Sequence, residues 1–456
     1  MFAKETYMQR RALLKKNLGS GVLLFLGNDE CGLNYEDNTF RYRQDSTFLY
    51  YFGLSCAGLS AIIDIDEDKE IIFGDELSID AIVWMGSQPT LHEKCERVGI
   101  REMMASTDIV GYLHKCVQSG KAIHYLPPYR PEHKLKLMDW LGIPPARQEG
   151  SVPFIRAVIA QRNYKSAEEI VEIEKACDVT ADMHTAMKVL RPGMYEYEVV
   201  AEMNRVAESN NCELSFATIA TINGQTLHNH YHGNKVKPGD LFLIDAGAEV
   251  ESGYAGDMSS TIPADKKFTT RQREVYEIQN AMHLESVKAL RPGIPYMDVY
   301  ELSARVMVDG MKTLGLMKGN TEDAVREGAH ALFYPHGLGH MMGLDVHDME
   351  NLGEIWVGYN GQPKSTQFGR KSQRLAIPLE PGFVHTVEPG IYFIPELIDM
   401  WKAEKKFTDF INYDKVETYK DFGGIRNEED YLITETGARR LGKKIPLTPE
   451  EVEALR

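Results

Sequence analysis

The stretch "HGLGHMMGLDVHD", residues 336–348, places three histidines and two aspartates within thirteen positions. Imidazole and carboxylate groups are common ligands of divalent transition metals. A helix would bring His336 and His340 onto one face, as in the H-E-x-x-H zinc motif. The residues between them are two glycines and a leucine, with no glutamate. Because each glycine costs about 1 kcal/mol inside a helix, we expect a glycine-flanked turn that brings the backbone close to a ligand.

Two aspartates flank a predicted hairpin in "DLFLIDAGAEVESGYAGDMSSTI", residues 240–262. An apolar run leads into Asp245, and the turn residues lie around Glu251 to Gly253. A turn centred near residue 251 would place Asp245 and Asp257 opposite each other. Two like charges that close require a shared proton or a cation between them. The alternative, a different register with both aspartates in solvent, stays open at this point.

Two glutamates lie in unusual local settings. Glu388 precedes Pro389 in "HTVEPGIYF", which favours an extended backbone at the glutamate. Glu428 follows two glycines in "FGGIRNEEDYLIT", and Arg426 would share its strand face and hold its carboxylate ionised. Taken alone, each glutamate also fits a solvated strand end. A further tract, "TLHNHYHGN", fits either a solvent face or a metal-binding segment.

The elements that position these residues fall into two domains, as expected for 456 residues. Residues 21–28 and 59–76 predict strands, the second stretch with an acidic hairpin turn. Ser166 and Glu169 form a predicted capping box that begins a long helix. We therefore place an N-terminal domain at 1–160 and a second domain at 161–456.

An internal repeat divides the second domain. The segments "KVLRPGMYEYEVVAEMNRV" (188–206) and "KALRPGIPYMDVYELSARV" (288–306) are identical at eight of nineteen positions without a gap. In each, a helical run ends at Leu-Arg-Pro-Gly and a second amphipathic run follows. This predicts two related halves, 161–265 and 266–456, about a pseudo-twofold axis, so that a site between them draws ligands from both.

The bulk composition excludes several classes of protein. A net charge of −16 argues against nucleic-acid binding. The sequence contains no run of 18 or more apolar residues, so we expect no membrane-spanning helix. The charged N-terminus lacks the apolar core of a secretory signal. Six dispersed cysteines without a CxxC pair indicate reduced thiols, which predicts a cytoplasmic protein.

Together these motifs resemble one family, the proline-specific branch of the pita-bread metallopeptidases, which contains prolidase and aminopeptidase P (M24B type). The matching segments, in the family's order, are "LIDAGAEVESGYAGD", "HGLGHMMGLDVHD", "TVEPGIYF" and "GIRNEED". "FRYRQDSTFLYYFGL" (40–54) resembles the N-terminal domain of the creatinase, prolidase and aminopeptidase P type. The resemblance implies an α+β chain, with that domain followed by a duplicated pita-bread catalytic domain.

The resemblance also implies a dinuclear metal site that hydrolyses Xaa-Pro bonds with a metal-bridging hydroxide as nucleophile. The metal would be two Mn²⁺ ions, with Co²⁺ or Zn²⁺ as substitutes, because hard oxygen donors with one imidazole suit manganese. The implied ligands are Asp245, Asp257, His340, Glu388 and Glu428. Four carboxylates balance the charge of two divalent cations.

Further roles follow from the same resemblance. Glu388 would accept the proton of the attacking water, and Arg426 would orient a ligand carboxylate. His228 and His347 would contact substrate and stabilise the tetrahedral intermediate, while His336 would lie near the proline pocket. No family ligand corresponds to the other two histidines of the tract, His230 and His232, which stay unassigned.

Arg374, fourteen residues before Glu388, stands where prolidases hold the free carboxylate of the substrate. This arginine and the long segment between Glu388 and Glu428 favour an Xaa-Pro dipeptidase. Likeness to aminopeptidase P around "RQDS" and "VWMG" keeps the Xaa-Pro aminopeptidase as the alternative. Trp84 matches a substrate-binding tryptophan that reaches a neighbouring subunit, which suggests a homodimer or larger homo-oligomer. The alternative from another class is a non-enzymatic peptide-binding module of the same fold.

Overall fold

The structure is a computed structural model that describes residues 2–456. Contacts divide the chain into two compact units. The first runs to Arg162 and also contains Met349–Trp356, and the second consists of Asn163–Asp348 and Val357–Arg456. The expected domain limits, 1–160 and 161–456, stay a prediction.

The first unit is built on a five-stranded sheet in the order β6-β5-β4-β1-β7. Its strands are β1 (Val22–Leu26), β4 (Ser60–Asp64), β5 (Lys69–Phe73), β6 (Glu102–Met104) and β7 (Ile123–Tyr125). Strands β4 and β5 pair antiparallel across an acidic turn in which Asp68 has φ 51°. Both strand predictions for this region are therefore confirmed.

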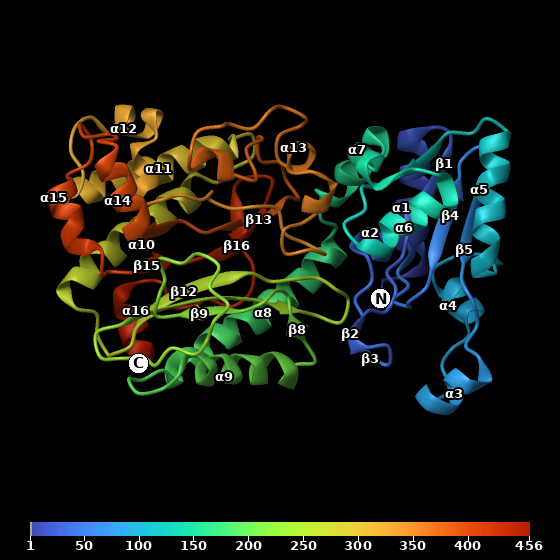
Figure 1. Cartoon of the computed structure of the whole chain (residues 1–456), viewed down its shortest axis with the longest axis horizontal. Coiled ribbons are helices and arrows are strands. Elements are labelled where there is room, and N and C mark those ends of the chain that lie inside the picture. The colour runs from blue at the N-terminus through green and yellow to red at the C-terminus, as the bar shows by residue number, and fades with distance from the viewer. Residues whose placement is uncertain (1) are drawn as a thin grey trace. The chain divides into compact units, whose positions relative to one another are not determined.

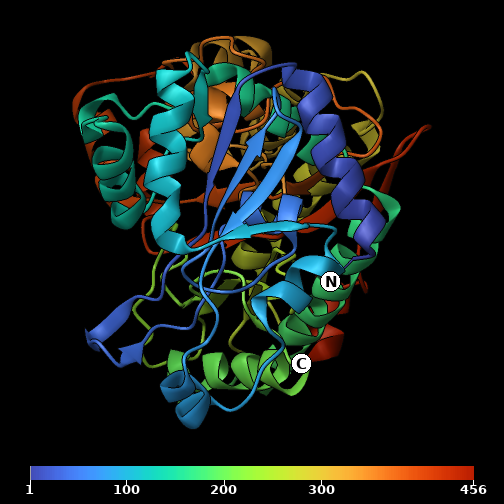
Figure 2. The same ribbon diagram turned by 90° about the vertical axis from the view of Figure 1, so that its right-hand side faces the viewer.

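Helices cover both faces of this sheet (Figure 2). Val22 and Leu24 pack with α5 (Ile109–Gln118) and α6 (Pro131–Leu141). The alternate residue Phe25 points to the other face, where it contacts Phe52 of α2 and Phe154 of α7. The helices of that face are α1 (Lys4–Leu18), α2 (Ser46–Phe52) and α7 (Val152–Arg162). The remaining elements of the unit are the short hairpin β2 (Gly32–Tyr35) and β3 (Asn38–Thr39), with α3 (Ile79–Met85) and α4 (Leu91–Arg97).

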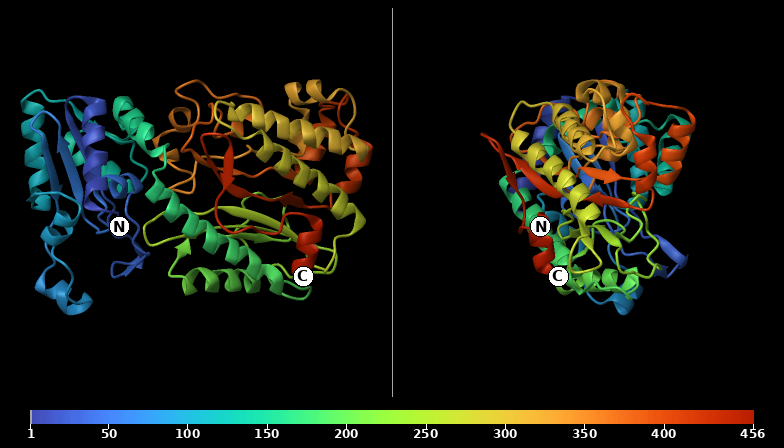
Figure 3. Two further views of the ribbon diagram at one scale, coloured as in Figure 1. Left: turned by 180° about the vertical axis from the view of Figure 1, so that it is seen from behind. Right: turned by 90° about the vertical axis from the view of Figure 1, so that its left-hand side faces the viewer.

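The second unit repeats a helix pair, as the internal repeat predicts. The first pair is α8 (Ala167–Ala186) and α9 (Glu196–Ser209), and the second is α10 (Thr270–Ala289) and α11 (Tyr296–Thr313). Figure 3 shows both pairs, the first in green and the second in yellow. The predicted capping box is present, because Ser166 and Glu169 bond each other's backbone N–H. Between the helices of each pair, Gly193 and Gly293 take positive φ angles of 95° and 84°, which favour glycine.

Each half also contributes a three-stranded antiparallel sheet (Figure 1). The first has the order β12-β10-β9, formed by β9 (Ile219–Thr221), β10 (Leu241–Ala246) and β12 (Met258–Pro263). The second has the order β13-β16-β17, formed by β13 (Val384–Val387), β16 (Glu429–Ile433) and β17 (Ala438–Arg440). The second unit also contains two separate two-stranded sheets. One pairs β8 (Glu213–Leu214) with β11 (Ala248–Glu249), and the other pairs β14 (Gly390–Tyr392) with β15 (Gly424–Arg426).

Smaller helices complete the chain. They are α12 (Thr321–Glu327), α13 (Glu354–Val357), α14 (Pro395–Ala403), α15 (Tyr413–Val416) and α16 (Pro449–Leu455). No helix in the described part, residues 2–456, combines the length and the apolar character that a bilayer crossing needs.

Candidate metal centre

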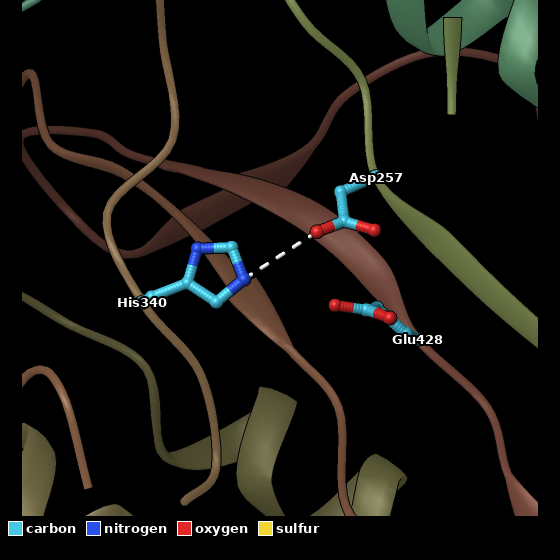
Figure 4. Close-up of side chains that lie close together, drawn as sticks. All are labelled: Asp257, His340 and Glu428. Carbon is cyan, nitrogen blue, oxygen red and sulfur yellow. Dashed lines mark ion pairs between the residues drawn. The ribbon is translucent and has the colours of Figure 1, made fainter. Parts of the chain in front are cut away.

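Three predicted ligands from distant parts of the chain converge in the second unit. Asp257, His340 and Glu428 each offer one ligand atom, and these atoms lie within 4.8 Å of one another. All three side chains are buried, and Figure 4 shows them pointing toward a common centre. Nε2 of His340 lies 3.4 Å from Oδ2 of Asp257. One buried imidazole and two carboxylates at these distances could hold a metal ion.

The hairpin that carries the two aspartates differs from the expected register. Asp245 pairs with Ser259 rather than with Asp257, and Ala246 pairs with Met258. The turn is centred one residue later than expected, where the N–H of Gly253 bonds the carbonyl of Val250. A shift of two residues keeps both aspartates on one face of the sheet. They are therefore diagonal neighbours, not directly opposed.

His340 presents its outer ring nitrogen to the carboxylates. Nδ1 lies 3.1 Å from the carbonyl oxygen of Met341, so Nδ1 carries the proton and donates it. The lone pair of Nε2 then points toward Asp257 and toward Oε1 of Glu388, which lies 3.7 Å away. The ring of His347 stacks on that of His340 at a centroid distance of 3.9 Å. Metal-binding histidines typically donate the N–H of the other ring nitrogen to a carbonyl or carboxylate, which fixes the tautomer.

The expected pairing of Arg426 with Glu428 is wrong. The guanidinium donates to Oδ2 of Asp245 at 2.8 Å, to the Tyr392 hydroxyl at 2.8 Å and to the Ser259 hydroxyl at 3.0 Å. The reason is that β15 ends at Arg426 and β16 begins after Glu428, so the two residues do not share one strand. Arg426 therefore holds one oxygen of Asp245 in place.

Burial and mutual repulsion raise the pKa of the clustered carboxyl groups. The pKa of Asp257 is well above its ordinary value because of desolvation first and then the charge of Asp245. Desolvation and the charge of Asp257 do the same to the pKa of Glu428. Desolvation also raises the pKa of Glu388. Such a cluster is stabilised by a cation that replaces the protons.

Two carboxylate oxygens are left for that cation. Oδ1 of Asp245 and Oδ1 of Asp257 are buried and have no hydrogen-bond partner among residues 2–456. A buried carboxylate oxygen without a partner is costly. The donor chemistry and the orphaned oxygens therefore fit divalent metal.

A cavity of about 470 Å³ opens onto this cluster. Besides Asp245, Asp257, His340, Glu388 and Glu428, its lining includes the other predicted residues of the second unit, namely His228, His336, His347, Arg374 and Arg426. His230 lines the cavity as well. His232 does not, and its Nε2 bonds the carbonyl of Thr218 at 3.0 Å. Trp84 lies in the first unit on α3, with its side chain 87% exposed.

Sequence reasoning missed several residues around the cavity. The hydroxyl of Tyr392 lies 2.9 Å from Nε2 of His336 and accepts from Arg426. The carbonyl of Gly337 accepts from Nδ1 of His336 at 2.7 Å, which places a proton on Nδ1. Burial lowers the pKa of His336 to about 3. The sequence feature that could have identified Tyr392 is its position in "EPGIY", four residues after Glu388. No sequence feature identified the apolar residues that line the cavity, which are Phe216, Ala217, Ile219, Leu227 and Val346.

Two family models match the chain. Residues 171–435 match metallopeptidase family M24, and residues 7–124 match the N-terminal domain of aminopeptidase P. The predicted α+β fold, an N-terminal domain of this type followed by a pita-bread catalytic domain, is confirmed.

Individual relatives cover nearly the whole chain. An Xaa-Pro aminopeptidase of Escherichia coli strain K12 is 32% identical over 99% of this chain and 98% of its own length. An Xaa-Pro dipeptidase of Rattus norvegicus is 28% identical over 97% of this chain and 90% of its own length. The structure of zinc-substituted E. coli aminopeptidase P with product superposes with a TM-score of 0.82 at 30% identity, covering 100% of this chain and 98% of the other. Match length and identity together show that this chain belongs to metallopeptidase family M24.

Proposed function

We propose that this metallopeptidase is an exopeptidase that hydrolyses the Xaa-Pro bond, with dipeptides as its preferred substrates. The observation that carries the proposal is the presence of Arg374 on the wall of the cavity that also contains the clustered carboxylates and His340. A fixed guanidinium near the reacting bond suits the free carboxylate of a C-terminal proline. The relatives named Xaa-Pro aminopeptidase and Xaa-Pro dipeptidase support the substrate class.

The proposed metal ligands are the five oxygen and nitrogen donors of the cluster, Asp245, Asp257, His340, Glu388 and Glu428. We propose two Mn²⁺ ions, because four carboxylates match their charge and hard oxygen donors suit manganese. Bound divalent metal lowers the pKa of water and polarises a carbonyl group.

The chain's own residues account for binding and proton transfer. Glu388 lies 3.7 Å from His340 at one oxygen and 3.8 Å from His336 at the other, which points its carboxylate into the site. Glu388 would take the proton of the attacking water and deliver it to the leaving prolyl nitrogen. His228 and His347, also on the cavity wall, would donate hydrogen bonds to the carbonyl oxygen as it gains charge.

The site can accept proline because it does not require an N–H group on the peptide bond that is cleaved. An Xaa-Pro bond is a tertiary amide without an N–H. A site that holds the ring by shape, against His336 and the apolar wall, and acts on the carbonyl does not need that donor. The apolar residues Ile219 and Leu227 in the cavity lining would receive the side chain that precedes proline.

An Xaa-Pro aminopeptidase acting on longer peptides is the second candidate. The full-length similarity to E. coli aminopeptidase P favours it. The two candidates differ in how they use Arg374. The manganese-loaded protein should cleave Leu-Pro faster than Leu-Pro-Pro, and Arg374→Ala should remove that preference. A wild-type preference for the tripeptide would establish the second candidate instead.

Two substitutions of proposed metal ligands test whether the protein is a metal-dependent enzyme. Asp257→Asn and Glu428→Gln should abolish hydrolysis of Ala-Pro and Leu-Pro. A metal-loaded wild type that is inactive on every Xaa-Pro peptide would favour the peptide-binding module.

We further propose a homodimer or larger homo-oligomer, supported by the exposed Trp84, and a cytoplasmic location, supported by six free cysteines.

A further inference from the structure

Gln373 is a fully buried polar residue next to Arg374. Its side chain joins two segments that are far apart in the sequence. Oε1 accepts a hydrogen bond of 2.7 Å from the backbone N–H of Leu338, and Nε2 donates one of 2.5 Å to the carbonyl of Leu375. The first bond ties the loop that carries Arg374 to the glycine-flanked turn that carries His340.

The same turn also holds Glu388. The carbonyl of Leu338 accepts a hydrogen bond of 2.8 Å from the backbone N–H of Glu388. Leu338 therefore bonds Gln373 with its N–H and Glu388 with its carbonyl. Two hydrogen bonds of Leu338, one from the backbone of Glu388 and one to the side chain of Gln373, therefore connect the segment of Arg374 to the backbone of Glu388.

The backbone around Arg374 is held on two further sides. A Cβ atom on Gly337 would lie 2.8 Å from Cα of Gln373, and a Cβ atom on Gly358 would lie 1.9 Å from the carbonyl oxygen of Arg374. Only glycine permits backbones to approach this closely. The hydroxyl of Tyr359 also donates to the carbonyl of Gln373 at 2.7 Å. These contacts fix the backbone position from which the Arg374 side chain extends.

We propose that Gln373 is a positioning residue that sets the distance between Arg374 and the catalytic groups, and thereby the substrate length that the enzyme prefers. The inference rests on the proposed function of Arg374 as the group that binds the proline carboxylate. Preorganisation matters because a guanidinium on a long flexible side chain loses affinity when its backbone anchor is free to move.

The test is a double-mutant cycle with Gln373→Met and Arg374→Ala, assayed with Leu-Pro and with Leu-Pro-amide, which lacks the carboxylate. Gln373→Met has a similar volume but no hydrogen bonds. We expect it to raise KM for Leu-Pro about tenfold, to change kcat less than about threefold and to leave Leu-Pro-amide unaffected. In the Arg374→Ala background, Gln373→Met should add less than about a twofold effect, because coupled residues are non-additive.

Gln367→Met is the matched control. Gln367 lies on the same loop, but its amide donates to the carbonyl of Arg326 at 3.0 Å rather than bonding the turn that carries His340. We expect wild-type kinetics for it. If Gln373→Met does not fold, Gln373→Glu keeps an acceptor for the Leu338 N–H, and it should raise KM for Leu-Pro relative to the wild type by less than about tenfold.

Two results separate failure of this inference from failure of the proposed function. A metal-loaded wild type that cleaves no Xaa-Pro substrate contradicts the proposed function. An active wild type in which Gln373→Met is neutral, lowers kcat equally for both substrates, or adds in full to Arg374→Ala contradicts the role of Gln373.

Discussion

The hydroxyl of Ser259 donates a hydrogen bond of 2.6 Å to Oε2 of Glu428. The backbone N–H of Glu428 in turn donates to the carbonyl of Ser259 at 3.0 Å. The same hydroxyl accepts from Nε of Arg426 at 3.0 Å. Ser259 belongs to the first half of the second unit and Glu428 to the second half, so one buried serine joins the two halves at the proposed metal site.

Ser259→Ala should weaken both the fold and metal binding. The substitution leaves a buried carboxylate oxygen and a guanidinium N–H without this partner, which costs about 1–3 kcal/mol of unfolding free energy. Loss of a hydrogen bond that orients a metal ligand typically lowers metal affinity about 10–100-fold. Urea denaturation of the metal-free protein and calorimetric titration with Mn²⁺ measure the two effects.

The neighbouring residue Ser260 provides the control. Its hydroxyl bonds Nδ1 of His184 at 2.9 Å, and it is equally buried. Successive residues of a strand point to opposite faces, so Ser260→Ala should lower stability by a similar amount without changing Mn²⁺ affinity. Equal losses of affinity in both variants would show that Ser259 acts only through the fold.

The hairpin of Asp245 and Asp257 illustrates what sequence can predict. The apolar run before Asp245 and the turn residues around Gly253 predicted strand, turn and strand correctly, but not the register. Neighbouring turn positions have similar chemistry, and a close approach between Gly247 and Gly256 selects one of them, since a Cβ on Gly247 would lie 1.8 Å from the carbonyl oxygen of Gly256. Because the error was an even number of residues, both aspartates still share a face, and their convergence was predicted for a sound reason.

Metal should stabilise the protein more as the pH rises. Asp257 and Glu428 have raised pKa values when folded, so the folded metal-free protein retains protons that the unfolded chain releases above about pH 4. Its stability therefore falls with rising pH through this range. Bound Mn²⁺ replaces these protons, so the increase in melting temperature on adding Mn²⁺ should grow from pH 5 to pH 8 in scanning calorimetry.

Asp257→Asn tests the origin of this effect. It removes one of the two strongly perturbed carboxyl groups, so the pH dependence of the metal-free protein should become shallower. A metal-induced shift in melting temperature that stays constant between pH 5 and pH 8 would contradict the assignment of these carboxylates to the metal.

Some residues of the site carry no indication in the sequence. The helix pairs follow from apolar periodicity and the capping box of Ser166, both of which are local. The roles of Ser259 and Gln373 depend on partners more than thirty residues away. Burial alone makes their hydroxyl or amide groups important, and burial of a polar residue is decided by tertiary packing.

Lys165 and Asp348 form a buried ion pair in the second unit. Nζ of Lys165 lies 2.7 Å from Oδ2 of Asp348, and each side chain is 1% exposed. Asp348 directly follows His347, and its backbone N–H donates to the carbonyl of Met341 at 2.9 Å. This backbone bond closes the loop between His340 and His347, the two histidines whose rings stack, and the ion pair anchors the end of the loop to Lys165.

Asp348→Asn should lower the free energy of unfolding by about 3–5 kcal/mol, because it removes the negative charge that offsets the burial of the Lys165 ammonium group. The matched control is Lys288→Met, which breaks the pair of Lys288 with Glu285, whose side chains are 68% and 45% exposed. An exposed pair contributes at most about 1 kcal/mol. Urea denaturation measures both variants. If Asp348→Asn costs no more than Lys288→Met, the pair does not hold the histidine loop, and the position of His347 depends on its stacking with His340 instead.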